Sequence, residues 1–335
     1  MRDQELVEVW RGASVESVHR GSLVVVDARG ATVLALGDPD QAVFPRSAIK
    51  ALQALPLIED GAAETYVLTD AEIALACASH SGEPEHVETS AGMLRKAGRE
   101  PACLECGAQW PMGEAAARAL AARGETPTAL NNNCSGKHAG FVCLACAAGT
   151  DAKGYVGADH PVQRRVRQVL DEVTGAAHDP ARAGVDGCSI PTYPIPLRAL
   201  ALGFARFGTA EGLSPDRARA AARIRRAVAA HPFRVAGTGR FDTRLMERLR
   251  ERAFVKTGAE GVYAATLPEL GLGMALKCSD GATRAAAVIM AALVQRFLPL
   301  ADEDARFVDA LARPELTNWN GLTVGRLTPT AALLD

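Results

Sequence analysis

The chain has 335 residues, of which 48% are hydrophobic and 23% charged, a composition typical of a soluble globular protein. Its 37 basic and 39 acidic residues give a formal net charge of −2, which argues against a surface for nucleic acid or anionic membranes. Neither a targeting signal nor an apolar run of membrane-spanning length is apparent in the sequence. We therefore expect a cytoplasmic protein, whose eight cysteines are thiols, ligands or core residues rather than disulfides.

Strand-like and helical patterns alternate along the chain in three blocks. Residues 6–36 alternate apolar and polar side chains, with a turn at 27–30, which predicts an antiparallel meander. The spacing of apolar residues then becomes helical, and it predicts helices over 47–57, 70–78, 85–97, 113–123, 137–148, 161–174, 196–207 and 214–230. Strand patterns return at 253–256, 261–266 and 272–278, and a long helix is predicted over 280–297.

This order of elements predicts an α+β fold. The N-terminal and C-terminal strands are expected to form one antiparallel sheet covered by helices, with a helical lobe inserted between them. The sheet-containing lobe would comprise residues 1–46 and 250–335, and the helical lobe residues 47–249. Because small-molecule sites are commonly found between lobes, we expect the active site in that cleft.

Two short motifs point to a serine nucleophile. Ser47 and Lys50 lie three residues apart at a predicted helix start, so their side chains share one face. A lysine with a lowered pKa can take the proton of a serine hydroxyl, and Ser-x-x-Lys is the nucleophile motif of serine β-lactamases. A helix-capping serine beside a solvated lysine would give the same pattern. The tripeptide Lys256-Thr257-Gly258, at the end of a C-terminal strand, favours the catalytic interpretation, because a Lys-Thr-Gly strand lines those same sites.

Two predicted loops carry cysteines that could bind a metal. Cys134 and Cys188 each lie among small or polar residues, and two thiolates are suitable ligands for zinc. Lys137 would be an unusual third ligand, since it must first lose its proton. Two buried thiols and an asparagine-rich turn remain the alternative. The pairs at 103/106 and 143/146 are interpreted as core residues, because the gap between them exceeds that of a zinc ribbon.

Six segments, in this order, resemble the L-asparaginase II family of the Rhizobium type: residues 15–21, 46–50, 78–83, 133–138, 186–188 and 256–261. The resemblance implies a serine β-lactamase-like fold, a homodimer and the hydrolysis of L-asparagine to L-aspartate and ammonia. On the matching positions it implies a structural or substrate-orienting zinc held by Cys134, Lys137 and Cys188. It also implies two serine–lysine pairs, Ser47 with Lys50 and Ser79 with Lys256. The chain departs from the family pattern at Gln109, where a histidine is usual, and we assign that residue no role.

These residues predict an acyl-enzyme mechanism. Ser47 is expected to attack the side-chain amide carbon of asparagine, with Lys50 as the base. Ser79 and Lys256 would relay protons, although the two serines could exchange roles. Backbone N–H groups near Ser47 would hold the oxyanion.

The amino acid substrate also needs groups for its α-carboxylate and α-amine. Arg46 is the candidate for the carboxylate, and Asp186 and Glu260 are the candidates for the amine. His138, beside the predicted metal ligands, is a further candidate substrate-binding residue. Two other functions remain open. One is a related hydrolase of glutamine or another small amide, and the other is a catalytically silent, zinc-containing binding protein.

Overall fold

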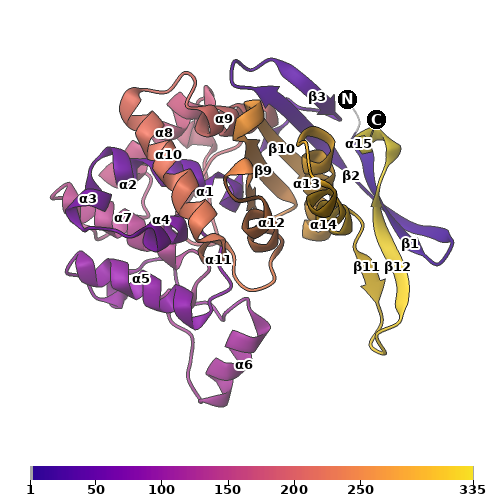
Figure 1. Ribbon diagram of the computed structural model, residues 1–335. Coiled ribbons are helices and arrows are strands. Elements are labelled where there is room, and N and C mark those ends of the chain that lie inside the picture. Colours follow the sequence, from indigo (N-terminus) through magenta and orange to yellow (C-terminus); the bar gives the residue numbers. More distant parts are fainter. Residues whose placement is uncertain (1–2, 335) are drawn as a thin grey trace.

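The computed structural model describes residues 3–334, and a curled antiparallel sheet forms its centre (Figure 1). Among these residues the sheet has eight strands, in the order β11-β12-β1-β2-β10-β9-β8, and β3 also pairs with β2. The strands are β1 (Gln4–Arg11), β2 (Ser14–Asp27), β3 (Thr32–Leu36), β8 (Phe254–Thr257), β9 (Val262–Leu267), β10 (Leu272–Cys278), β11 (Glu315–Thr317) and β12 (Thr323–Pro329). The predicted sheet of N-terminal and C-terminal strands is thereby confirmed, since β2 pairs directly with β10.

Helices fill the middle of the chain and follow the last central strand. They are α1 (Lys50–Gln53), α2 (Leu55–Glu59), α3 (Ala62–Thr65), α4 (Asp70–Ala76), α5 (Pro84–Lys96), α6 (Glu114–Ala122), α7 (Ser135–Ala147), α8 (Pro161–Thr174), α9 (Leu197–Thr209), α10 (Pro215–Ala230), α11 (Pro232–Val235), α12 (Phe241–Leu249), α13 (Thr283–Phe297), α14 (Asp302–Ala312) and α15 (Ala331–Leu334). Two small ladders pair β4 (Ala42–Val43) with β7 (Ile195–Pro196), and β5 (Gly184–Val185) with β6 (Pro191–Thr192).

The predicted single helix over 47–57 is wrong in detail. The chain forms a 3₁₀ turn, η1 (Arg46–Ile49), and then the separate short helices α1 and α2. Pro56 supplies the reason, because it has no N–H with which to continue the hydrogen-bond ladder back to Leu52.

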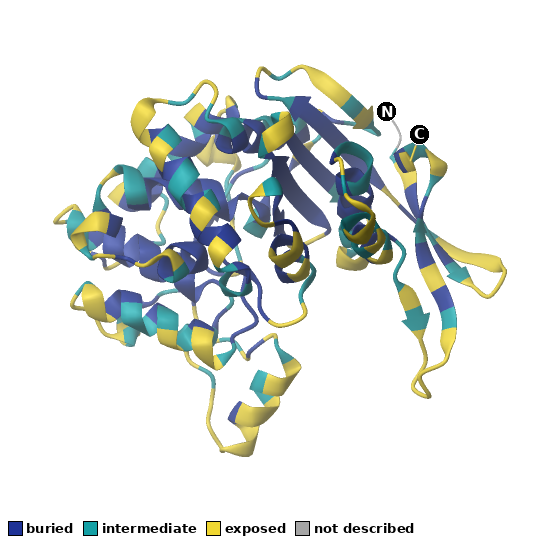
Figure 2. Ribbon diagram, in the orientation of Figure 1, coloured by how far each residue is buried: buried dark blue, intermediate teal, exposed yellow. Residues whose placement is uncertain are grey.

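The central strands are covered on both faces. Every residue of β8 and β9 is buried, as the dark blue centre of Figure 2 shows. Helix α9 packs so closely on β10 that a Cβ at Gly273 would lie 2.0 Å from the carbonyl oxygen of Ala201. Helix α13 contacts β9 and β10 as well, and burial on both faces places it on the side opposite α9. A helix of the middle block therefore covers the sheet, and the division into two lobes at 46/47 and 249/250 stays a prediction.

The predicted elements end at residue 297, and the structure contains further helices and strands after that position. Strands β11 and β12 form a hairpin that projects from the body beside the ends of β1 and β2 (Figure 1). At its tip Trp319 is fully exposed and Leu322 largely so. Within residues 3–334 no helix combines the length and the apolar character needed to cross a bilayer.

Candidate active site

Five segments converge beside the buried end of β8. They are η1 with α1, the loop that follows α4, the N-terminal end of α7, the loop after β5 and β8 itself. The loop after α4 is extended and held on both sides by backbone hydrogen bonds. Ser79 N donates to Val235 O at 3.0 Å, and Ser81 N to Ala236 O at 2.8 Å. Between them His80 N donates to Asn133 O at 3.1 Å, which places Ser79 next to the loop that carries Cys134.

Lys50 is the centre of this convergence. Its side chain is 1% exposed, and its Nζ donates to Ala78 O at 2.6 Å, to Ser79 Oγ at 2.9 Å and to Cys134 Sγ at 3.0 Å. Three donated hydrogen bonds use all the protons of an ammonium group, whereas a neutral amine has only two. The three contacts therefore suit an ammonium group and fix the position of the Lys50 amine. The geometry also joins Ser79 to Lys50, where the sequence had paired Ser79 with Lys256.

Ser47 lies at the start of η1, one residue after a strained position. Arg46 has φ +51°, a conformation that costs free energy for a residue with a side chain and is found mainly where the surrounding structure imposes it. Ser47 is half-buried, and among the described residues its hydroxyl makes no hydrogen bond. Its N–H belongs to the first turn of a helix, where donors have no partner within the helix. Ser47 thus offers a free hydroxyl beside a free backbone donor.

Lys256 is fully buried in β8 and differs from Lys50 in its surroundings. Its Nζ donates to Thr257 O at 2.9 Å and lies 4.0 Å from Asp242 Oδ2. Burial lowers the pKa of Lys256 to about 7, and the positive charge of Lys50 acts in the same direction. Lys256 is therefore the lysine that can be neutral near neutral pH.

Cys134, Lys137 and Cys188 lie together, as the sequence analysis expected. Lys137 Nζ is 3.0 Å from Cys188 Sγ, and hydrogen bonding with Cys188 lowers the pKa of the Cys134 thiol. Burial opposes the charge on Lys137, but Cys188 and Cys134 outweigh it and raise the pKa of that amine. Zinc binding by these two sulfurs and one amine stays a prediction, because Lys137 must first lose its proton to act as a ligand. Residues 3–334 contain no group of three or more His, Cys, Asp or Glu side chains that would form a conventional metal site.

The candidate substrate-binding residues occupy different environments. Arg46 Nε donates to Asp186 Oδ1 at 2.7 Å, so these two side chains form a pair at the edge of the site. His138 is completely buried, with Nδ1 hydrogen-bonded to Tyr155 OH at 2.7 Å. Burial holds the pKa of His138 well below its usual value, so this imidazole is neutral. Glu260 is exposed on the loop after β8, and the structure does not join its carboxylate to Arg46 or Asp186.

The sequence analysis assigned no role to three residues that the fold places here, Asp242, Tyr263 and Gln109. Asp242, in the first turn of α12, accepts hydrogen bonds from Thr257 N and from Tyr263 OH, and it lies next to Lys256. Gln109 Oε1 accepts from Asn133 N at 3.2 Å and so supports the turn before Cys134. No local motif marks any of these positions, because their contacts join residues far apart in the chain.

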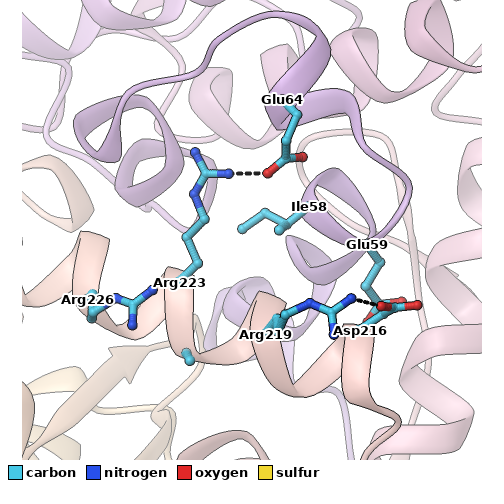
Figure 3. Close-up of a pocket in the computed structure, with 8 residues that line it drawn as sticks. Ile58, Glu59, Glu64, Asp216, Arg219, Arg223 and Arg226 are labelled. Atoms are coloured by element: carbon cyan, nitrogen blue, oxygen red, sulfur yellow. Dashed lines mark hydrogen bonds and ion pairs between the residues drawn. The ribbon is translucent and has the colours of Figure 1, made fainter.

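Two hollows of about 460 Å³ lie elsewhere on the described part of the chain. One of them is found between α10 and the α2–α3 region, where Arg223 pairs with Glu64 and Arg219 with Asp216 (Figure 3). The balance of opposite charges in this hollow is that of a surface ion-pair network. None of the candidate site residues lines it.

A comparison with protein-family models gives the decisive match. The model of the family described as L-asparaginase II matches residues 7–329, nearly the whole chain. The chain belongs to the L-asparaginase II family. No curated protein gives a significant match. Family membership confirms that the chain is an asparaginase, an amidohydrolase whose substrate is the small molecule asparagine.

Gly258 offers a direct test of the packing that places Ser47 in this asparaginase. A Cβ at Gly258 would lie 2.8 Å from Pro45 O and 3.1 Å from Ala48 N, so β8 approaches the backbone on either side of Ser47. We expect Gly258→Ala to lower the free energy of unfolding by about 1–3 kcal/mol, as overpacking does, measured by urea unfolding. Asparaginase activity should fall at least about tenfold because Ser47 is displaced.

Gly187→Ala is the matched control for this substitution. Gly187 also lies in a site loop, but a Cβ there would meet nothing within 4 Å. Its free energy of unfolding should stay within about 0.5 kcal/mol of the wild type. Equal stability of both variants would contradict the close approach of β8 to η1.

Proposed function

We propose that this asparaginase hydrolyses L-asparagine through a serine acyl-enzyme, in a serine β-lactamase-like fold with the site between the sheet and the inserted helical lobe. The observation that carries the proposal is the 2.9 Å hydrogen bond between Lys50 and Ser79. Lys50 itself lies one helical turn after Ser47. A nucleophile, a cation and a second hydroxyl within one buried site are the components of serine–lysine amide hydrolysis.

Ser47 is the proposed nucleophile, because its hydroxyl is free and partly accessible whereas Ser79 is 6% exposed and engaged by Lys50. The Ser47 oxygen attacks the side-chain carbonyl carbon of asparagine, and the Ser47 N–H is a candidate oxyanion donor. The C–N bond of the tetrahedral intermediate breaks and ammonia leaves. Water then attacks the resulting ester, and L-aspartate and the free serine are released.

The two lysines have different proposed roles. The sequence analysis assigned the base to Lys50, but its three hydrogen bonds favour a role in which the Lys50 amine holds Ser79 in place. Lys256, with its pKa of about 7, is the better base. We infer that the proton of Ser47 passes through Ser79 to Lys256 and is later delivered to the leaving ammonia. Lys256 must turn from Thr257 O toward Ser79 for this step, in keeping with catalytic hydrogen bonds that tighten only with substrate bound.

Arg46 and Asp186 fit the two charged ends of an amino acid. Arg46 uses Nε for Asp186, which leaves both terminal nitrogens of the guanidinium for the α-carboxylate. Asp186 has its second oxygen for the α-amine, and Lys137 and Arg46 outweigh burial to hold the pKa of its carboxyl below the usual range. Glu260 is retained as a second candidate for the amine. We propose that His138 does not contact the substrate. Its hydrogen bond to Tyr155 would instead hold the backbone next to Lys137, the preceding residue, in place.

Zinc is proposed as a bound ion held by Cys134, Lys137 and Cys188. When bound, it would supply a fixed positive charge that orients the substrate or the loops at the site. We expect the purified protein to contain about one zinc per chain, measured by elemental analysis, and Cys188→Ser to lose it. Cys278→Ser is the control, because Cys278 is buried in β10 away from these ligands. Wild-type protein that neither contains nor takes up zinc would contradict this part of the proposal.

The substrate is tested by ammonia release from L-asparagine and, in parallel, from L-glutamine. We expect release from asparagine to exceed release from glutamine by about 10–200-fold, the discrimination that one methylene provides in a pocket. Equal or greater release from glutamine would favour the related amidohydrolase. Release from neither, with bound asparagine recovered intact, would favour the binding protein.

A homodimer and a cytoplasmic location are proposed on the resemblance and the composition. The exposed Trp319 and Leu322 at the tip of the β11–β12 hairpin are apolar groups that a second subunit would cover. Sedimentation equilibrium would distinguish a dimer from the 35.1 kDa monomer.

A further inference from the structure

Asp242 has a buried side-chain carboxylate close to the amine of Lys256. It lies in the first turn of α12 and is 2% exposed. Its Oδ1 accepts a hydrogen bond from Tyr263 OH, and its Oδ2 accepts one from Thr257 N at 3.1 Å. A carboxyl group that accepts on both oxygens is acting as an ionised acceptor. Its position at a helix N-terminus further favours negative charge there.

These contacts connect Asp242 to the two strands that define the site. Thr257 is the last residue of β8, and Tyr263 lies opposite it on β9. The Oδ2 atom that accepts from Thr257 N is also the atom that lies 4.0 Å from Lys256 Nζ. One carboxylate therefore fixes the backbone after Lys256 and attracts the amine of the same residue.

We propose that Asp242 is a positioning residue of this asparaginase, which holds the Lys256 side chain at the end of β8 for proton transfer to and from Ser79. The inference rests on the proposed function. It assigns to Asp242 an effect on where the Lys256 amine lies and on how readily it holds a proton. A purely structural Asp242 would only fasten α12 to the sheet.

The charges around Lys256 come from several elements. Asp242 and Cys134 favour the protonated amine, whereas Lys50 and Arg240 oppose it. The other titratable groups that face it are Cys77 and His80, after α4, and Tyr263 on β9. Burial holds the pKa of His80 well below its usual value and raises that of Cys77 to about 12, so both are neutral near pH 7. Asp242 is thus the anion on α12 that opposes the two neighbouring cations.

The test compares Asp242→Asn with Tyr263→Phe. Asp242→Asn removes the charge and keeps the shape, whereas Tyr263→Phe removes one hydrogen bond and keeps the charge. For Asp242→Asn we expect kcat for asparagine to fall about 100-fold with KM within about twofold, the pattern of a group that acts on the chemical step. The pH profile of kcat/KM should also change. In the wild type, an activity that needs neutral Lys256 rises with pH through about 7, which gives the profile a rising acidic limb. Loss of the Asp242 carboxylate should move this limb to lower pH, because that carboxylate favours the protonated amine.

Tyr263→Phe should lose less than about tenfold in kcat and keep the wild-type limb, because the carboxylate remains beside Lys256. Parallel losses of stability and activity in both variants, with neither limb moved, would overturn the proposal. If Asp242→Asn does not fold, Asp242→Ser replaces it, and an unchanged kcat with an unmoved pH profile in that variant would equally overturn the proposal. Failure of the proposed function is distinguishable from either result, because the wild-type protein would then form no aspartyl ester on Ser47 when it is given asparagine.

Discussion

Ser47→Ala is expected to lower kcat for L-asparagine by at least about 10⁴-fold, the loss typical when a nucleophile is removed. The substitution removes only the hydroxyl, and in the structure that hydroxyl has no partner among the described residues, so folding should be unaffected. Ammonia release measures the turnover. Mass spectrometry of acid-quenched enzyme should show the aspartyl ester in the wild type and its absence in the variant.

Ser79→Ala separates the roles of the two serines. It removes a relay hydroxyl and the acceptor of one Lys50 hydrogen bond, so we expect a smaller loss of about 10²–10⁴-fold, the contribution of general acid–base catalysis. Ester should still accumulate on Ser47. If the wild-type enzyme instead carried the aspartyl ester on Ser79, and Ser47→Ala remained active, the two serines would have exchanged roles. Ser189→Ala, at an exposed position near Cys188, is the control and should remain fully active.

Lys50→Met is expected to lower kcat by about 10³-fold, because it removes the cation that orients Ser79 and helps to keep Lys256 neutral. Methionine fills a similar volume, so the packing of α1 should persist. The Ala78 carbonyl loses its donor, which should cost about 1–3 kcal/mol in the free energy of unfolding. Kinetics with asparagine and urea unfolding measure the two effects independently.

Lys96→Met provides the comparison for Lys50. Lys96 also forms a hydrogen-bonded ion pair, with Glu72, but it is exposed at the C-terminal end of α5 and has no contact with the candidate site residues among its hydrogen bonds. Its substitution should leave kcat within about twofold of the wild type. A Lys50→Met enzyme that retains more than about a tenth of wild-type kcat would restrict Lys50 to a structural role and leave Lys256 as the functional lysine.

Local sequence patterns were sufficient for much of the architecture. Apolar alternation identified β1 to β3 and β8 to β10, and helical spacing identified the longer helices from α4 to α10 and α13, because these elements bury a face whose period is visible in the residues themselves. The same approach gave no prediction for β11 and β12. Strand β11 is short and mostly exposed, and two of the three buried residues of β12 are Gly325 and Pro329, so these strands carry little of the apolar signal on which such predictions depend.

Prediction of the candidate site from the sequence has a similar limit. The sequence by itself determined which residue types are present, in motifs such as Ser47 to Lys50 and Lys256 to Gly258, and the order of these motifs indicated the family that the comparison confirmed. Only the tertiary structure decided which groups meet: Lys50 with Ser79 and Cys134, and Lys256 with Asp242. The physical reason is that these contacts join residues 14 to 84 positions apart through the packing of separate elements, whereas propensity and periodicity act only over neighbouring turns and strands.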